Sequence, residues 1–148
     1  ILFISSIYIK TKVENQLNED KIVFTNGCFD IIHPGHIEYL KESRSHGTAL
    51  IVGLNSDESM KRIKRKSYHT QDQRKQVLEA IRYVDKVIIF EEDTPLELIK
   101  KVKPYMITKG GDYEPEFVVG RGLAWIKIMD TMPGQSSSKI LDFINDKT

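Results

Sequence analysis

The chain has 148 residues, of which 40% are hydrophobic and 29% are charged, with a formal net charge of +1. This length suits a single domain with one core, and the composition excludes a chain that is disordered throughout. A nearly neutral charge provides no global field that would attract nucleic acid or an anionic membrane. The one cysteine, Cys28, excludes an internal disulfide and a cysteine-based zinc cluster, and it fits a reducing cytoplasm.

The chain opens with an apolar run at residues 1–9. This run is much shorter than the roughly 20 residues of a membrane span. It also lacks the basic start and the small-residue cleavage pattern of a signal peptide. We therefore expect residues 1–20 to be an N-terminal extension or linker and residues 21–148 to form the folded domain.

The stretch Thr25–His36, called the signature segment below, follows a short apolar strand and leads into a helix that begins near Pro34. A strand, a glycine turn and a helix start together present backbone N–H groups that can bind phosphate. His33 and His36 are three residues apart and share one face of the helix start, and Gly35 leaves room for a ligand. A charge-assisted hydrogen bond to phosphate contributes about 1.5–3 kcal/mol. A helix N-terminus contributes only about 0.3–1 kcal/mol. The two imidazoles should therefore dominate phosphate binding. A lone histidine would more often be a plain surface residue.

A second strand is predicted at residues 49–54, followed by a short capped helix through Ile63. The basic run at residues 61–66 fits either a solvated loop or a mobile loop that closes Lys64 over a polyphosphate. Thr70 and Gln73 have capping-box spacing and open the next helix. Arg74 lies in its first turn, where a cation opposes the helix dipole, which indicates a nearby anion.

Three further strands are predicted at residues 86–90, 105–108 and 125–129. A capping box at Thr94 with proline at the first helical position predicts a helix between the first two of them. The glycines after Lys109 form either a ligand loop or a tight turn. Three serines at residues 136–138 open a last helix whose apolar side chains, at residues 140, 141 and 144, should face inward. Capping needs only one serine, so phosphate binding is a second reason for this cluster.

The alternation of strands and helices predicts an α/β fold of the Rossmann-like, doubly wound type, with a five-stranded parallel sheet and helices on both faces. Ligands of such sheets bind at the carboxyl ends of the strands. The signature segment, the turn at residues 55–57, the loop at 109–112 and the serine cluster all follow strand ends. They should converge on one edge of the sheet.

Three motifs carry a resemblance to a known family. The sequence T-N-G-C-F-D-I-I-H-P-G-H of the signature segment resembles the HxGH motif of the nucleotidyltransferase superfamily that includes the cytidylyltransferases. Residues 90–99 with the K-G-G-D-Y run at 109–113 look most like the heptose 1-phosphate adenylyltransferases. The run G-Q-S-S-S-K-I at 134–140 resembles the family motif G-x-S-[ST]-T-x-I. The resemblance covers residues 21–144 and makes residues 21–148 a nucleotidyltransferase domain.

The resemblance implies a set of site residues. Those implied to act in catalysis are His33, His36, Lys64 and Arg74. Those implied to bind the nucleotide are Thr25, Asn26, Gly27, Cys28, Phe29, Gly35, Lys109, Gly110, Asp112, Ser136, Ser137 and Ser138. Those implied to bind the second substrate are Asp30, Asn55 and Asp57.

The implied reaction joins a nucleoside monophosphate, from ATP, to a sugar phosphate such as D-glycero-D-manno-heptose 1-phosphate, and releases pyrophosphate. Mg²⁺ is expected as a cofactor held through the phosphates, without protein ligands of its own. A homo-oligomer and a fusion or partnership with a sugar kinase domain fit the resemblance, whereas nucleic acid and membrane are not expected partners.

Three departures from the family pattern leave alternatives open. Ser138 replaces the usual threonine and keeps the hydroxyl. Residues 68–70 and 81–85 look closer to the glycerol 3-phosphate cytidylyltransferases, so CTP with a polyol phosphate is the alternative pair of substrates. The segment between Arg121 and Trp125 is shorter than in the heptose enzymes. This difference keeps open a non-catalytic nucleotide-binding module.

Overall fold

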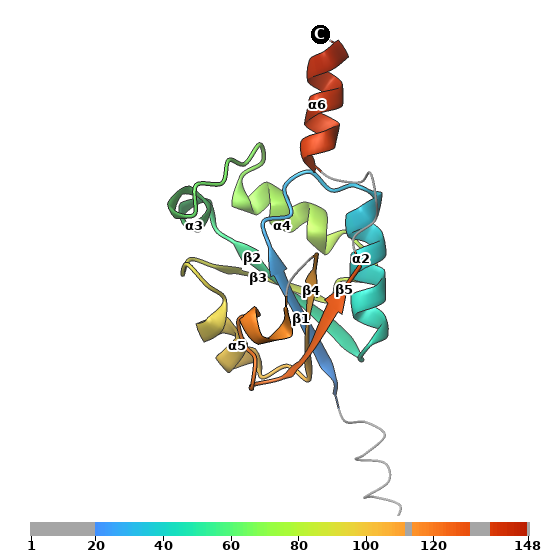
Figure 1. Cartoon of the computed structure of the whole chain (residues 1–148), viewed down its shortest axis with the longest axis vertical. Coiled ribbons are helices and arrows are strands. Elements are labelled where there is room, and N and C mark those ends of the chain that lie inside the picture. The colour runs from blue at the N-terminus through green and yellow to red at the C-terminus, as the bar shows by residue number, and fades with distance from the viewer. Residues whose placement is uncertain (1–19, 112–113, 131–136, 148) are drawn as a thin grey trace, which may run out of the picture.

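Five parallel strands form one sheet in the order β3-β2-β1-β4-β5 (Figure 1). The computed structural model describes residues 20–111, 114–130 and 137–147. The strands are β1 (Ile22–Gly27), β2 (Ala49–Asn55), β3 (Lys86–Phe90), β4 (Met106–Gly110) and β5 (Trp125–Met129). Each lies within two residues of its predicted bounds, apart from β1, which runs on into the signature segment. The predicted five-stranded, Rossmann-like parallel sheet is confirmed.

Helices connect the strands on both sides of the sheet (Figure 1). They are α2 (Pro34–Ser45), α3 (Asp57–Arg62), α4 (Gln71–Glu79) and α5 (Leu96–Val102), with a short 3₁₀ helix, η1 (Pro115–Phe117), between β4 and β5. A last helix, α6 (Ser137–Lys147), follows β5. None of the helices in the described ranges is both long enough and apolar enough to cross a membrane.

Alternating strand residues build two hydrophobic layers. Val23 of β1 joins a cluster that contains Leu40 of α2 and Leu78 of α4 on one face. The next residue, Phe24, joins Ile99 of α5 and other side chains on the opposite face. Because successive side chains of a strand point to opposite faces, a strand covered on both faces must be apolar throughout. This explains the continuous apolar runs of the sequence.

The strand order places a topological switch point between β1 and β4. From β1 the chain adds β2 and β3 on one side, and then crosses to add β4 and β5 on the other. In open α/β sheets the crevice outside the carboxyl ends of the strands at such a point binds ligands. The signature segment leaves β1 there, and the glycines after Lys109 leave β4 beside it.

Two details of the helices differ from the sequence-based expectation. Pro95, rather than Thr94, is the N-cap of α5, and this helix has no side-chain cap. The helix starts one residue later than expected, so Glu97 lies too close to the N-cap for capping-box spacing. Two of the three apolar side chains of α6 that were expected to face inward, Leu141 and Ile144, are 45% and 51% exposed, whereas Ile140 is half-buried. The reason is that α6 stands beyond the end of the sheet rather than against either face (Figure 1).

Candidate active site

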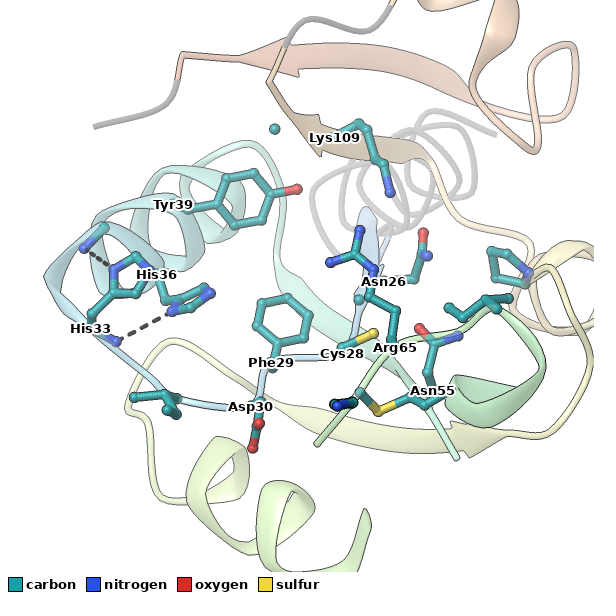
Figure 2. A pocket seen from close by; sticks show the side chains of 18 of the residues that line it. Asn26, Cys28, Phe29, Asp30, His33, His36, Tyr39, Asn55, Arg65 and Lys109 are labelled. Atoms are coloured by element: carbon teal, nitrogen blue, oxygen red, sulfur yellow. Dashed lines mark hydrogen bonds between the residues drawn. The ribbon is translucent and has the colours of Figure 1, made fainter. Parts of the chain in front are cut away.

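A cavity of about 700 Å³ opens at the carboxyl ends of the strands (Figure 2). Every strand contributes at or just beyond its end: Asn26 and Gly27 from β1, Asn55 from β2, Phe90 from β3, Lys109 and Gly110 from β4, and Asp130 after β5. Leu141 of α6 also lines it. Segments separated by more than 100 residues in the sequence therefore meet around one space.

His33 and His36 form the N-terminal cap of α2 at the wall of this cavity. The Nδ1 atom of His33 accepts a hydrogen bond from the N–H of Gly35 at 3.1 Å. The Nδ1 atom of His36 accepts one from the N–H of His33 at 3.2 Å. This is a capping box in which histidine replaces both of the usual residue types. Since each Nδ1 atom acts as an acceptor, each neutral ring carries its proton on Nε2, which remains a donor for a ligand.

The two rings are close enough to influence each other's charge. Their centroids are 3.9 Å apart. Burial and the neighbouring His33 lower the pKa of His36 to about 4, and burial lowers the pKa of His33 as well. Both imidazoles are thus neutral at pH 7. In this state they keep the cap and present two N–H donors to the cavity.

Two cations face each other across the cavity. Arg65 and Lys109 both line it and turn their charged ends toward its middle, near Asn26 and Cys28 (Figure 2). Burial, together with the charge of Arg65, lowers the pKa of Lys109. Two positive groups brought together in a partly buried space favour an anion between them. Burial raises the pKa of the Cys28 thiol, so Cys28 is a wall residue rather than a nucleophile.

The structure places Arg65, rather than Lys64, at the cavity. Lys64 has a left-handed backbone conformation (φ 58°) just after the end of α3. The N–H of Arg65 bonds to the carbonyl of Met60 at 2.8 Å, and the N–H of Lys64 bonds to that of Lys61 at 3.1 Å. These two bonds form a Schellman motif. The turn leaves Lys64 out of the cavity lining, which Arg65 and Lys66 enter instead.

Three more of the expected residues lie beside the cavity rather than in its lining. Thr25 is fully buried and bonds to the hydroxyl of Tyr39 at 2.7 Å and to the carbonyl of Thr108 at 3.2 Å. Arg74 is also fully buried, and it bonds to the carboxylate of Asp57 at 2.9 Å. These side chains tie strand ends and helices together behind the lining.

The remaining expected residues divide into two groups. Those that line the cavity are Asn26, Gly27, Cys28, Phe29, Asp30, His33, Gly35, His36, Asn55, Lys109 and Gly110. Asp112 and Ser136 lie outside the described residues. Ser137 and Ser138 form the first turn of α6. Leu141, one turn further along α6, lines the same cavity as the histidines. Contact between the serine hydroxyls and the phosphates stays a prediction.

Several lining residues were not predicted from the sequence. Tyr39 lies one turn beyond His36 on α2, so its helical spacing from that residue could have indicated it. Phe90 and Asp130 end or follow strands, which is the rule that located the other loops. Met60 and Pro95 have no local signal, because their places depend on how α3 and α5 pack against the sheet.

A family profile described as cytidylyltransferase-like matches residues 24–140. The chain belongs to the cytidylyltransferase-like family. The sequence-based identification of a nucleotidyltransferase of this superfamily is thereby confirmed. The matched range contains the signature segment, the cavity cations Arg65, Lys66 and Lys109, and the start of α6.

Similar proteins support this assignment. The chain is 51% identical over 133 residues to the bifunctional protein HldE of Campylobacter jejuni (strain RM1221), which covers 88% of the chain and 29% of that protein. It is 49% identical over 129 residues to the bifunctional protein HldE of Aliarcobacter butzleri, covering 85% of the chain and 27% of that protein. The chain thus spans less than a third of the length of these relatives.

Two solved structures share the fold. The lipopolysaccharide core biosynthesis protein from Thermoplasma volcanium superposes with a TM-score of 0.67 at 26% identity, over 77% of this chain and 98% of that one. The pantoate-beta-alanine ligase from Francisella tularensis, in complex with beta-gamma ATP and beta-alanine, gives a TM-score of 0.55 at 15% identity, over 82% of this chain and 62% of that one. The second likeness concerns the fold alone.

Proposed function

We propose that this domain transfers the adenylyl group of ATP to a sugar 1-phosphate and releases pyrophosphate. The acceptor we propose is D-glycero-D-manno-heptose 1-phosphate. The observation that carries the proposal is the pairing of His33 and His36 with Arg65 and Lys109 around one cavity at the switch point of the sheet. Two neutral N–H donors and two cations around such a space suit a chain of phosphates.

The reaction needs no nucleophile from the protein. An oxygen of the sugar phosphate attacks the α-phosphorus of ATP, a new P–O bond forms, and the bond to the oxygen that bridges the α- and β-phosphates breaks. Phosphoryl transfer is catalysed chiefly by positioning and by stabilising charge. We assign the Nε2–H groups of His33 and His36 to the oxygens where that charge grows. Arg65 and Lys109 are assigned to the phosphate chain.

Mg²⁺ is part of this proposal as a cofactor that arrives with the triphosphate. The described residues contain no group of three or more histidine, cysteine, aspartate or glutamate side chains able to hold a metal ion. Asp30, which lines the cavity, already accepts two backbone N–H groups. When bound, the ion neutralises charge on the phosphates and on the leaving pyrophosphate. An ion held through phosphate oxygens needs no such group of protein ligands.

The identity of the substrates rests on similarity. The relatives that match over most of this chain are named bifunctional protein HldE, and a solved structure of the same fold is named a lipopolysaccharide core biosynthesis protein. Together with the resemblance of residues 90–99 and 109–113 to the heptose adenylyltransferases, these names favour ATP and a heptose phosphate. Because those relatives are bifunctional and much longer, we also propose that the domain works with a sugar kinase domain in a cytoplasmic pathway.

The deciding experiment measures pyrophosphate release from each of the four nucleoside triphosphates with Mg²⁺, against a panel of sugar and polyol phosphates. We expect release with ATP and heptose 1-phosphate well above every other pair. Release with CTP and glycerol 3-phosphate instead would assign the chain to the alternative substrates. ATP binding by calorimetry without release for any acceptor would overturn the transferase proposal in favour of a nucleotide-binding module.

A further inference from the structure

The carboxylate of Asp30 holds two successive backbone groups of a distant segment. Its oxygens accept the N–H of Tyr68 at 2.7 Å and the N–H of His69 at 3.0 Å. Asp30 lies in the signature segment, and the two amides belong to the connection between α3 and α4. A carboxylate that accepts two backbone donors makes charge-assisted hydrogen bonds, which are the stronger kind. One side chain therefore ties this connection to the segment that carries the two histidines.

The guanidinium of Arg74 holds the same connection from the other side. Its Nε donates to the carbonyl of His69 at 3.3 Å, so the N–H and the C=O of that residue are bound by Asp30 and Arg74 respectively. The Nη1 atom donates to the carbonyls of Cys28 at 2.9 Å and Asn55 at 2.8 Å. Arg74 is fully buried, so these bonds and the ion pair with Asp57 take the place of water around its charge. It joins the ends of β1 and β2 to the α3–α4 connection.

The stretch between these contacts and α3 carries two cations of the cavity, Arg65 and Lys66. At its start, the Schellman turn binds the N–H of Arg65 to Met60. At its end, Tyr68 and His69 are bound by Asp30 and Arg74. The stretch is therefore fixed at both ends, and its charged side chains are placed relative to the signature segment.

We propose that Asp30 and Arg74 form a positioning clamp on the backbone of His69, which sets the distance of Arg65 and Lys66 from the imidazoles of His33 and His36. Asp30 and Arg74 then act through these cations rather than by binding substrate, although the resemblance implied direct roles for both. This inference rests on the proposed function, since it assigns to the two cations the phosphates of that reaction. Misplacement of a binding group by about 1 Å can reduce a rate about 100-fold, so such a clamp has a measurable effect.

The test compares Asp30→Asn with the double variant Arg65→Gln/Lys66→Gln and with the triple combination. Asparagine keeps the size of the side chain but loses one acceptor and the charge. We expect Asp30→Asn to lower kcat for pyrophosphate release by about 10- to 100-fold. In the background without the two cations, the same change should lower kcat less than about threefold, because residues that act through one another are not additive. Full multiplication of the two effects would show that Asp30 acts on the substrate directly and would overturn the clamp.

A matched control distinguishes positioning from general loss of structure. Asp85 also accepts a backbone N–H, that of Leu50 at 2.7 Å, and it pairs with Arg44 at 2.9 Å. Asp85 immediately precedes β3, so it lies at the amino ends of the strands, whereas the cavity lies at their carboxyl ends. Asp85→Asn should lower the unfolding temperature at least as much as Asp30→Asn and leave kcat within about twofold of wild type. Equal losses of kcat in the two variants would count against a specific clamp.

A binding measurement separates this inference from the proposed reaction. Calorimetry with inorganic tripolyphosphate needs no turnover and no knowledge of the acceptor. We expect Asp30→Asn to weaken tripolyphosphate binding about tenfold, and the triple combination to bind no more weakly than the double variant. Unchanged binding by Asp30→Asn would overturn the clamp. Wild-type protein that binds tripolyphosphate but releases no pyrophosphate with any pair of substrates would overturn the proposed function alone.

A conservative change of Arg74, the second residue of the clamp, gives an independent check. Arg74→Lys keeps the charge, but the ammonium group lacks the planar fork that reaches several acceptors at once. We expect the amides of Tyr68 and His69 to exchange with solvent at least tenfold faster in this variant and in Asp30→Asn, with core amides unchanged. Wild-type exchange at these two amides in Asp30→Asn would show that the carboxylate does not hold the segment.

Discussion

His33 and His36 each perform two tasks at once. The Nδ1 atoms cap α2 and the Nε2–H groups are left for a ligand, so the same rings that start the helix also line the cavity. A capping box usually relies on serine or threonine with glutamate or glutamine, none of which would offer a neutral ring N–H at this place. Under the proposed function, the ligand therefore determines the residue type and the helix determines the spacing.

Replacing His36 with alanine should lower kcat about 10²- to 10⁴-fold, the effect of one positioned donor. Steady-state pyrophosphate release measures it. His46→Ala changes the same residue type at the other end of α2, and it should leave kcat within about twofold. A loss of less than threefold for His36→Ala would remove this side chain from the chemistry.

The pKa of His36 predicts a pH dependence of stability. The unfolded chain has the ordinary pKa of 6.5 and the folded chain about 4, so between these values the unfolded state binds more protons. The free energy of unfolding should therefore fall as the pH drops from 6.5 to 4, by about 1–2 kcal/mol after allowing for solvent screening of this partly exposed ring. Urea unfolding across this range, with His36→Gln for comparison, measures the effect. Equal pH profiles for the two proteins would contradict it.

The left-handed backbone conformation of Lys64, just after α3, is unfavourable for a residue with a side chain. A non-glycine residue in the left-handed region costs about 1–2 kcal/mol relative to the right-handed one, and glycine avoids this cost. We therefore expect Lys64→Gly to raise the free energy of unfolding by up to about 1 kcal/mol, as measured by thermal or urea unfolding. Lys66→Gly, two residues further on, lacks this advantage and should not stabilise the protein. A destabilised Lys64→Gly variant would show that its side chain makes a contribution larger than the strain.

At the scale of the elements, the helices differ in whether side chains cap their N-termini. Thr70 and Gln73 form a reciprocal capping box at α4, with bonds of 3.3 Å and 3.1 Å. At α5 the N-cap is Pro95, whose side chain has no hydrogen-bonding group. Arg74 lies in the first turn of α4, so the capping box that starts this helix also positions one of the two clamp residues.

The contrast between the two helices makes a matched pair of variants. Thr70→Ala removes the N-cap of α4 and should destabilise the protein by about 0.5–2 kcal/mol. Thr94→Ala removes a similar hydroxyl next to the start of α5 that caps nothing, and it should change stability by less than about 0.5 kcal/mol. Urea unfolding of both variants measures this. The reverse order would mean that the α5 cap was assigned to the wrong residue.

At the scale of the whole molecule, one cavity gathers residues from every strand, from the signature segment to α6. A ligand in that space contacts both halves of the doubly wound sheet and is absent from the unfolded chain. Binding there must stabilise the fold as a unit, because only the folded state brings the segments together.

ATP with Mg²⁺ at about 100 times its dissociation constant should therefore stabilise the protein by about 2.7 kcal/mol. The shift in unfolding temperature across a titration of ATP measures it. His36→Ala should need a higher ATP concentration for the same shift. An unfolding temperature that is independent of ATP in the wild-type protein would contradict a nucleotide site in this cavity.

Much of the fold follows from local pattern alone. Continuous apolar runs identified the buried strands, and Pro34 between two histidines marked the start of α2. The signature segment is compact in sequence, and most of its residues line the cavity. Local pattern succeeds here because hydrophobic periodicity and helix capping act over a few neighbouring residues.

The choice of cations was decided only by the tertiary structure. In the sequence, Lys64, Arg65 and Lys66 form one basic run, and only the left-handed turn at Lys64 determines which of them enter the cavity. Arg74 lies in the first turn of its helix, where the sequence predicts a phosphate ligand. In the folded chain it is buried and donates instead to the carbonyls of Cys28 and Asn55, which are 46 and 19 residues away in the sequence. Long-range contacts of this kind depend on how the strand ends meet, and no local pattern encodes them.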